Sequence, residues 1–140
     1  MDQPFSAPDA LRRANLRVTA IRTAVLDVVA AAPHAEAEAV RRGVVERLGS
    51  VSVQSIYDTL NVLREAGLLR RVELAGHPAL YEIHAHDNHH HMACRSCGVV
   101  LDVACAVGRM PCLAPSETHG FVLDEAEVIY WGRCPACSAG

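Results

Sequence analysis

Two Cys-x-x-Cys pairs constrain the fold of this chain more than any other feature. Cys94 and Cys97 form the first pair, and Cys134 and Cys137 form the second. Each spacing lets two thiolates bind one ion, and four thiolates are typical ligands of structural Zn²⁺. An ion bound by both pairs closes the 36 residues between Cys97 and Cys134 into a loop. We therefore expect a zinc-containing fold in the second half of the chain.

Two other uses of these cysteines are disfavoured. Disulfides are rare in cytoplasmic proteins, and a thioredoxin-like redox motif has a single Cys-x-x-Cys that opens a helix after a strand. The two remaining cysteines, Cys105 and Cys112, are expected to be small buried thiols rather than redox sensors.

Length and composition exclude several protein classes. A chain of 140 residues cannot form a large catalytic barrel or a doubly wound sheet. With 51% hydrophobic and 21% charged residues, it can bury a core and is not compositionally disordered. The apolar stretches are too short to span a bilayer, and we expect no leader sequence, because the first residues lack a basic segment followed by an apolar one. We expect a cytoplasmic protein with no membrane partner.

The charge distribution leaves room for one local contact with nucleic acid. The net charge of −3 argues against unspecific binding to DNA or RNA. All 13 basic residues are arginine, and four of them lie between Ala10 and Val25, where there is no acidic residue. They are Arg12, Arg13, Arg17 and Arg22. This basic stripe is compatible with an oriented contact to DNA.

Hydrophobic periodicity predicts four helices in the first half of the chain. They are expected at residues 7–14, 20–31 and 36–48, and from Val53 to just before Gly67. Thr19 is a good N-cap for the second helix, and Gly49 suits the C-terminal end of the third. The fourth helix is expected to expose Gln54, Ser55, Asp58 and Asn61 opposite its apolar face.

A β-hairpin is expected after the helices. Residues 69–74 and 79–83 favour strands, and residues 75–78 favour a turn between them. Helices followed by a hairpin indicate a winged helix-turn-helix, with the fourth helix reading DNA. A small α+β domain whose polar helix face is merely solvated fits the same pattern.

The second half of the chain is expected to form a separate small domain. The polar segment 84–88 is a candidate boundary, which gives domains at residues 1–84 and 85–140. Strands are expected at residues 91–94, 99–103 and 128–131, a short helix within 104–113, and further strand at 121–123. A domain of this size needs a metal or a partner chain for stability. The predicted fold class is α+β, a winged helix-turn-helix domain followed by a small α/β domain with a four-cysteine zinc site.

A histidine cluster precedes the first cysteine pair. His84, His86, His89, His90 and His91 fall within eight residues of sequence. In a strand, His89 and His91 would share one face, while His90 would lie on the other. Together with the carboxylates of Glu82 and Asp102, they supply ligands suited to Fe²⁺, Mn²⁺ or Zn²⁺. A solvated histidine-rich loop that binds metals adventitiously is an equally good interpretation of the composition.

Taken together, these motifs resemble the ferric uptake regulator (Fur) family of metal-dependent repressors. The resemblance covers nearly the whole chain and is most specific in the His-x-His-x-x-Cys-x-x-Cys run at its distance from the second Cys-x-x-Cys pair. The matching segments are residues 16–19, 33–34, 55–60, 81–82, 89–98 and 134–137. Residues 87–91, 105–112 and 124–132 further resemble the actinobacterial FurA type, a peroxide-sensing branch linked to catalase-peroxidase control.

The resemblance implies two metal sites and a dimer. The regulatory Fe²⁺ or Mn²⁺, with Zn²⁺ as a substitute in vitro, would be bound by His34, Glu82, His89, His91 and Asp102; His34 is assigned by the resemblance alone. The structural Zn²⁺ falls on Cys94, Cys97, Cys134 and Cys137. Asp102 stands where iron-sensing members have Glu and peroxide-sensing members tend to have Asp. A third family site retains only His90 and His119, because Arg109 and Ala126 replace ligands.

The resulting expectation is a homodimeric, peroxide-responsive repressor of oxidative-stress or iron genes. It would bind double-stranded palindromic operator DNA, with Arg12, Arg13 and Arg17 on phosphates and Gln54, Ser55 and Tyr57 on base edges. Asp58, where several members have Arg or Asn, alters the usual base contacts. The alternatives are a zinc- or nickel-responsive repressor of the same family and a thiol redox protein. The hydrolase motif His-Glu-x-x-His is absent, and we expect neither an enzyme nor a small-molecule substrate.

Overall fold

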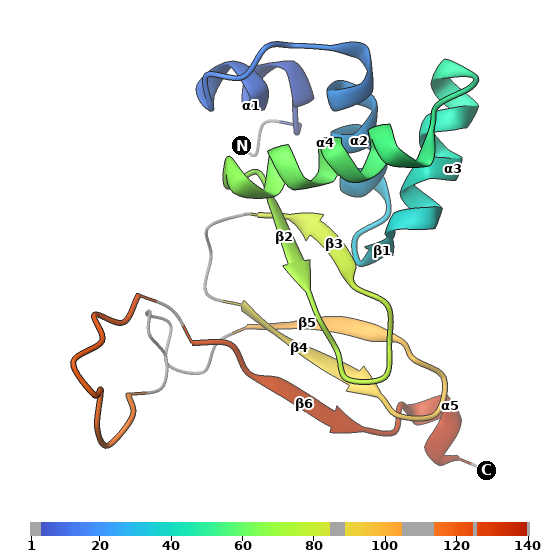
Figure 1. Ribbon diagram of the computed structural model, residues 1–140. Coiled ribbons are helices and arrows are strands. Elements are labelled where there is room, and N and C mark those ends of the chain that lie inside the picture. Colours follow the sequence, from blue (N-terminus) through green and yellow to red (C-terminus); the bar gives the residue numbers. More distant parts are fainter. Residues whose placement is uncertain (1–3, 85–88, 105–113, 125, 140) are drawn as a thin grey trace. The chain divides into compact units, whose positions relative to one another are not determined.

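The computed structural model describes residues 4–84, 89–104, 114–124 and 126–139. The chain divides into two compact units, residues 1–85 and residues 86–140 (Figure 1). Among the described residues, no helix has the length and apolarity required to cross a membrane.

Four helices make up most of the first unit. They are α1 (Ala7–Arg13), α2 (Ala20–Ala31), α3 (Ala37–Leu48) and α4 (Val53–Glu65). Three of them begin where a hydroxyl caps the helix: the side-chain oxygens of Ser6, Thr19 and Ser52 each accept a hydrogen bond from the backbone N–H three residues later. The predicted helices are confirmed, and α3 begins one residue later than expected because Glu36 belongs to a strand.

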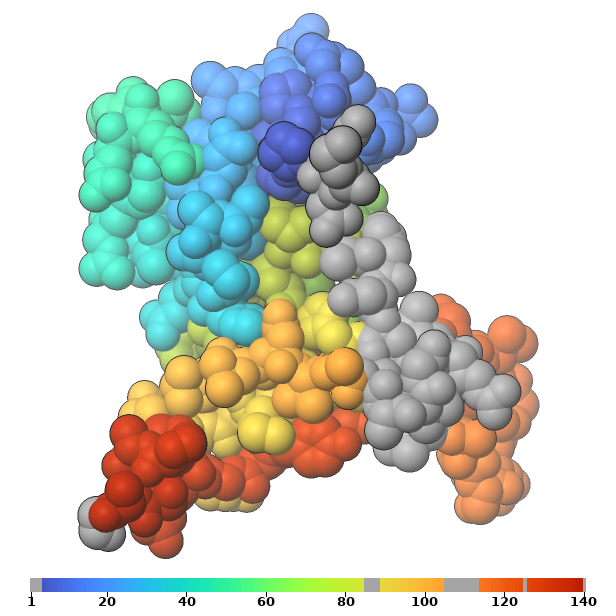
Figure 2. Space-filling model, turned by 180° about the vertical axis from the view of Figure 1, so that it is seen from behind, coloured from blue at the N-terminus to red at the C-terminus, as the bar shows by residue number. Residues whose placement is uncertain are grey.

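The core of the first unit lies where the helices meet. Helix α2 lies between α1 and α3, and α4 crosses in front of it in Figure 1; the opposite side of the helices is visible in Figure 2. The largest fully buried apolar side chains are Leu11, Val25, Leu26, Val29, Val40, Val44, Ile56, Leu60, Leu63, Leu69 and Val72. Helices α2 and α3 approach closely at Gly43, where an added Cβ would lie 2.8 Å from Cγ1 of Val28. A side chain at position 43 would therefore push these helices apart.

A three-stranded antiparallel sheet completes the first unit. Its strands are β1 (Ala35–Glu36), β2 (Leu69–Val72) and β3 (Leu80–Ile83), in the order β1-β3-β2. The β2–β3 hairpin confirms the predicted wing, with Leu69 opposite Ile83 and Val72 opposite Leu80. Strand β1 was not expected, because two residues carry no periodic signal. Helices followed by this hairpin form the predicted winged helix-turn-helix.

The second unit is built on a second three-stranded sheet. Its elements are β4 (His89–Cys94), β5 (Val100–Ala104), β6 (Ile129–Gly132) and the short α5 (Pro135–Ser138). The strand order is β5-β4-β6, in which β5 is antiparallel and β6 parallel to β4.

Several details of the second unit differ from the expectations. Strand β4 begins two residues earlier than expected, and α5 was not predicted. The strand expected at residues 121–123 is wrong: this segment has no regular secondary structure, and Phe121 and Val122 are 72% and 98% exposed. Ala104 ends β5 instead of starting a helix. The rest of that predicted helix, with Cys105 and Cys112, lies outside the described residues.

The described part of the second unit buries very little apolar surface. Among its described residues, Ala93 and Cys94 are the buried apolar ones, whereas the other two buried side chains are His90 and His91. The hydrophobic core cluster belongs entirely to the first unit. The described part of the second unit therefore depends on something other than a hydrophobic core.

Candidate metal centre

The two cysteine pairs meet at one end of the second sheet. Cys94 is the last residue of β4, and Cys97 follows in the turn before β5. Cys134 precedes α5 and Cys137 lies within it. The parallel register places Cys94 opposite Gly132, so β4 and β6 deliver their cysteines to the same edge.

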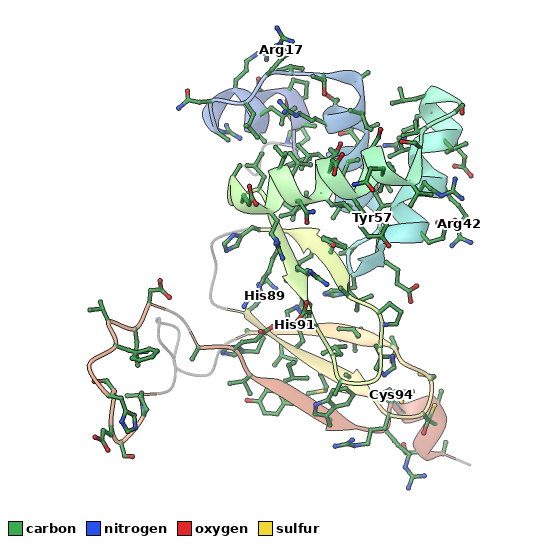
Figure 3. All side chains as sticks on the ribbon, in the orientation of Figure 1. Arg17, Arg42, Tyr57, His89, His91 and Cys94 are labelled. Carbon is green, nitrogen blue, oxygen red and sulfur yellow. The ribbon has the colours of Figure 1, made fainter. Side chains whose placement is uncertain are left out.

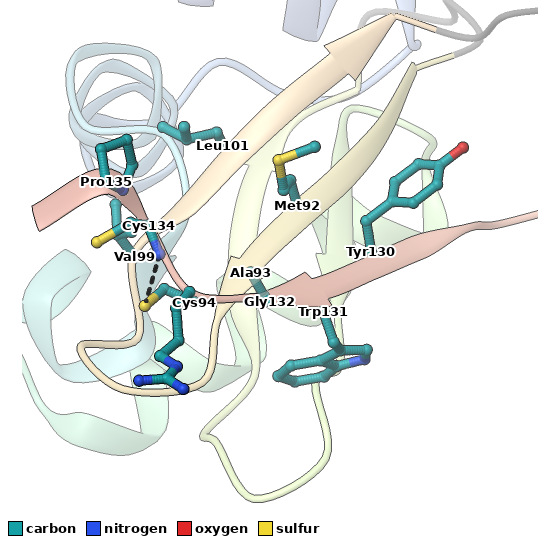
Figure 4. Close-up of a pocket in the computed structure, with 11 residues that line it drawn as sticks. Met92, Ala93, Cys94, Val99, Leu101, Tyr130, Trp131, Gly132, Cys134 and Pro135 are labelled. Atoms are coloured by element: carbon teal, nitrogen blue, oxygen red, sulfur yellow. Dashed lines mark hydrogen bonds between the residues drawn. The ribbon is translucent and has the colours of Figure 1, made fainter. Parts of the chain in front are cut away.

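The geometry of the four sulfurs fits a tetrahedral ion. All four Sγ atoms lie within 4.8 Å of one another, and those of Cys97 and Cys134 are 3.7 Å apart. Bonds of about 2.3 Å to a central Zn²⁺ give sulfur–sulfur separations of about 3.8 Å in a regular tetrahedron. The backbone N–H groups of Cys97 and Cys134 point at the Sγ of Cys94, at 3.5 and 3.3 Å. Figure 4 shows the contact with Cys134.

The cluster favours a bound cation electrostatically. The N–H groups of Cys97 and Cys134 lower the pKa of the Cys94 thiol to about 5. The neighbouring thiol groups, Cys134 first, raise the pKa of Cys137 to about 12. Four thiolates can coexist at neutral pH only when a cation compensates their mutual repulsion. This donor set therefore fits structural Zn²⁺.

A second group of candidate ligands lies in the first unit. Nε2 of His34 is 3.0 Å from Oε2 of Glu82, and both side chains are largely buried. Strand β1 explains this contact, because Ala35 pairs with Tyr81 on β3 and the two ligands flank that pair. His34 adopts a left-handed backbone conformation, with φ of 64°. A non-glycine residue is uncommon there, and such strain is concentrated at functional sites.

The second unit holds three further candidate ligands. His91 pairs with Asp102 across β4 and β5, and His89 lies on the same side of β4. The Nε2 atoms of His89 and His91 are 3.7 and 3.5 Å from Oδ1 of Asp102, and the two rings pack edge to face. Figure 3 shows both histidines towards one end of β4 and Cys94 at the other. This cluster is therefore separate from the four cysteines.

His90 and His119, the remaining candidate ligands of the second unit, lie in different environments. Nδ1 of His90 accepts a hydrogen bond from the backbone N–H of Val128 at 3.2 Å, which ties β4 to the approach to β6. His119 lies beside Glu117 in an exposed segment. Sequence reasoning did not single out Glu127, whose Oε1 lies 3.9 Å from Nδ1 of His91. No motif marks this residue, because the pairing of β4 with β6 brings it there.

The candidate DNA-contacting residues of the first unit lie on α4 and around α1 and α2. Tyr57 is 46% exposed, and Gln54 donates a hydrogen bond to Asp58 at 2.8 Å. Ser55 accepts a hydrogen bond from the hydroxyl of Ser52, at the start of α4. Figure 3 shows Tyr57 on α4 and Arg42 on the neighbouring α3.

Arg17, which precedes α2, and Arg22, which lies within it, are close to α4. Arg17 and Arg22 line an open recess with Asp58, and Arg22 donates a hydrogen bond to the carbonyl of Arg17 at 2.9 Å. Arg12 is paired with Asp9 at 3.1 Å, and Arg13 is exposed at the end of α1. Arg17 therefore connects the basic stripe to the exposed face of α4.

Known proteins are similar to this chain over most of its length. The family model "Ferric uptake regulator family" matches residues 13–129. The transcriptional regulator FurA of Mycobacterium tuberculosis is 54% identical over 136 residues, covering 95% of this chain and 92% of that protein. Ferric uptake regulation protein 1 of Mycolicibacterium fortuitum is 54% identical over 121 residues, covering 86% and 75%.

The fold also matches a solved structure. The ferric uptake regulator of Pseudomonas aeruginosa, solved with manganese, is 27% identical to this chain. The match covers 94% of this chain and 99% of that chain, with a TM-score of 0.73. The relatives are named as transcriptional regulators, which confirms the expectation that the chain is a regulator and not an enzyme. The chain belongs to the ferric uptake regulator family of metal-responsive, DNA-binding transcriptional regulators.

Proposed function

We propose that this chain is a homodimeric repressor that binds palindromic DNA when Fe²⁺ or Mn²⁺ occupies a site formed by both units. The observation that carries this proposal is the division of the nitrogen and oxygen ligands. His34 and Glu82 come from the first unit, whereas His89, His91 and Asp102 come from the second. This donor set suits Fe²⁺ and Mn²⁺ better than a soft metal.

The division of ligands couples metal binding to DNA binding. Two ligands alone hold a divalent ion weakly, so His34 and Glu82 bind it well only when His89, His91 and Asp102 bind it too. The ion therefore stabilises an arrangement of the units in which all five ligands converge. The size of this stabilisation is set by how much more tightly the ion binds to that arrangement than to the others. We infer that this arrangement presents α4 and the β2–β3 wing to DNA.

Exposed apolar side chains support the homodimer. Met92, Leu101 and Tyr130 are 45%, 56% and 47% exposed and line an apolar recess on the second sheet (Figure 4). A second copy of the chain would cover this surface together with Phe121 and Val122. Two-fold symmetry then requires two equivalent DNA half-sites, which is why a palindrome is proposed.

The contacts to DNA are assigned by the position of each residue and the chemistry of its side chain. Arg12, Arg13 and Arg17 would contact phosphates, and Gln54, Ser55 and Tyr57 would meet base edges or thymine methyl groups. Because arginine–phosphate contacts release counterions, affinity should fall steeply as salt rises.

Selection from a random double-stranded DNA library, with Mn²⁺ present, tests the proposal without knowledge of the operator. The expected product is an inverted repeat bound by the dimer. His34→Ala and His91→Ala should each abolish the Mn²⁺ dependence of binding to that repeat. His119→Ala removes an exposed histidine outside both ligand groups and should bind like the wild type. Metal-independent binding by the wild type, or unchanged Mn²⁺ dependence in His91→Ala, would contradict the proposal.

We further propose that the regulator senses peroxide when iron is bound. Fe²⁺ held by the five proposed ligands would supply the chemistry that activates H₂O₂. Asp102, the shorter carboxylate at the fifth position, motivates this assignment by its resemblance to peroxide-sensing members. The reaction would replace a ring C–H of His34 or His89 by C–OH, with one oxygen of H₂O₂ added and the other released as water.

Mass spectrometry tests the peroxide step. After H₂O₂ treatment, the iron-loaded protein should gain one oxygen atom on the peptide that contains His34 or His89, and it should release DNA. The manganese-loaded protein is the control and should remain unmodified. DNA release from iron-loaded protein without any modified histidine would exclude the step. The metal content of protein isolated from cells separates this regulator from a zinc- or nickel-responsive one.

A further inference from the structure

A carboxylate outside the five proposed ligands lies beside His91, the most buried of the described histidines of the second unit. The side chain of His91 is 0% exposed, and its two ring nitrogens face different carboxylates. Nε2 lies 3.5 Å from Oδ1 of Asp102, and Nδ1 lies 3.9 Å from Oε1 of Glu127. The imidazole therefore lies between two negative charges.

The backbone fixes Glu127 next to β4. The N–H of His91 donates to the carbonyl of Val128 at 3.2 Å, and the N–H of Val128 donates to Nδ1 of His90, also at 3.2 Å. The parallel pairing then continues with His91 opposite Ile129. Glu127 is held in position by hydrogen bonds on the residue that follows it.

The shared position of Asp102 defines which nitrogen of His91 would bind the ion. Nε2 of His89 and Nε2 of His91 both approach Oδ1 of Asp102, so these three atoms are directed towards a common point. When Nε2 of a neutral imidazole binds a metal, Nδ1 carries the ring proton. That N–H faces Glu127.

We propose that Glu127 is a positioning residue for the regulatory metal site. Nδ1 of His91 and Oε1 of Glu127 are 3.9 Å apart, which is too far for a direct hydrogen bond; a small movement of the Glu127 side chain would let its carboxylate accept one from Nδ1–H. This contact fixes the tautomer and orientation of the imidazole and makes Nε2 a stronger ligand. The inference rests on the proposed function, because it concerns the same metal site, but it adds a sixth residue that does not touch the ion.

Three features separate this role from direct ligation and from a generic surface charge. Glu127 faces Nδ1, whereas the common point lies on the Nε2 side of the ring. Its side chain is 39% exposed, so its carboxylate can move towards the ring without displacing packed neighbours. The histidine that it faces has no exposed surface, so its orientation is set by these neighbours rather than by bulk solvent.

Titration calorimetry with Mn²⁺ on the zinc-loaded full chain tests the inference. Glu127→Gln, which keeps the size of the side chain and removes its charge, should weaken Mn²⁺ affinity about 10- to 100-fold, the usual effect of losing such a partner. Glu127→Asp keeps the carboxylate and should recover part of that affinity. Glu117→Gln removes an equivalent charge from an exposed segment and should bind like the wild type.

Two further measurements distinguish a positioning role from loss of zinc, loss of folding or a change of ligand. The zinc content and the melting temperature of manganese-free Glu127→Gln should match the wild type, since the zinc site and the fold do not need the charge. With Co²⁺ as the probe, the visible absorption of saturated Glu127→Gln should keep its wild-type shape, because the ligands are unchanged.

The possible outcomes are distinct. Unchanged Mn²⁺ affinity in Glu127→Gln would overturn the inference, and so would a loss as large as that in His91→Ala with an altered Co²⁺ spectrum, which would make Glu127 a ligand. A melting temperature of Glu127→Gln below that of the wild type, together with a loss of Mn²⁺ affinity in Glu127→Asp as large as in Glu127→Gln, would indicate a structural role. This result would also overturn the inference. Failure of the proposed function gives a different result, namely that His91→Ala itself retains wild-type affinity.

Discussion

Removal of zinc should unfold the second unit and leave the first unit folded. The perturbation is Cys134→Ser, which replaces the sulfur that lies 3.7 Å from Sγ of Cys97 and also alters the N-terminal end of α5. Cys105→Ser is the matched control, since it exchanges a cysteine that belongs to neither Cys-x-x-Cys pair.

The magnitude follows from what each unit buries. A structural Zn²⁺ site contributes about 10–16 kcal/mol at neutral pH, which is comparable with the total stability of a typical domain, about 5–15 kcal/mol. The described part of the second unit buries only Ala93 and Cys94 as apolar residues, so packing cannot replace that contribution. The first unit keeps its complete core cluster without the metal.

Two spectroscopic signals separate the units. Trp131 is the only tryptophan of the chain and lies in β6, with the guanidinium carbon of Arg95 5.1 Å from its ring centre. Arg95 lies between Cys94 and Cys97, and its backbone N–H donates a hydrogen bond to the carbonyl of Gly132 at 2.8 Å. Loss of zinc should release this contact and shift tryptophan emission to the red. Far-UV circular dichroism should hardly change, because only the 4 residues of α5 are described as helical in this unit.

Urea unfolding followed by both signals completes the test. Cys134→Ser and chelator-treated wild type should show altered emission before any urea is added, with the dichroism transition of the helices retained. Cys105→Ser should behave like untreated wild type. Simultaneous loss of both signals on zinc removal, or unchanged emission after zinc has left, would refute the reasoning.

Three further predictions address the first unit. Leu60→Ala removes a fully buried side chain from the core and should lower the free energy of unfolding by about 2–5 kcal/mol in urea titrations. Gly43→Ala should cost about 1–3 kcal/mol through its clash with Val28, and Val28→Ala should relieve part of that loss in the double variant; additive losses would show that the two sites do not meet. Arg17→Ala should weaken binding to all DNA sequences alike and reduce the salt slope by about 1, whereas a changed sequence preference would assign Arg17 to base readout.

Local sequence signals predicted the first unit well. Thr19 was predicted to cap the second helix, and its hydroxyl accepts the expected backbone hydrogen bond. Ser6 and Ser52 precede α1 and α4 and accept the same kind of bond. The Gly-containing turn between two β-favouring segments predicted the hairpin. Strand β1 could not be predicted, because it consists of two residues whose strand conformation depends on pairing with β3.

Non-local pairing limits what the sequence reveals about the sites. The cysteines and histidines are recognisable because their spacing carries the chemistry. The contact of His34 with Glu82 depends on β1, and that of Glu127 with His91 depends on a parallel strand pair far apart in sequence. The exposed segment 121–123 was predicted as a strand from its residue types, but it has no strand partner among the described residues.

The left-handed backbone of His34 links the thermal stability of the chain to its proposed response to metal. Holding a non-glycine residue at φ of 64° costs on the order of 1 kcal/mol or more, and glycine at this position would remove that strain. His34→Gly would also remove the imidazole. Glycine would also leave the buried carboxylate of Glu82 without the imidazole that lies 3.0 Å from it, and this loss opposes the gain from the relieved strain. Under the proposed function, a variant selected for heat resistance alone could in addition lose a ligand of the regulatory metal. Selection schemes for a durable biosensor based on this chain need to score the response and the melting temperature together.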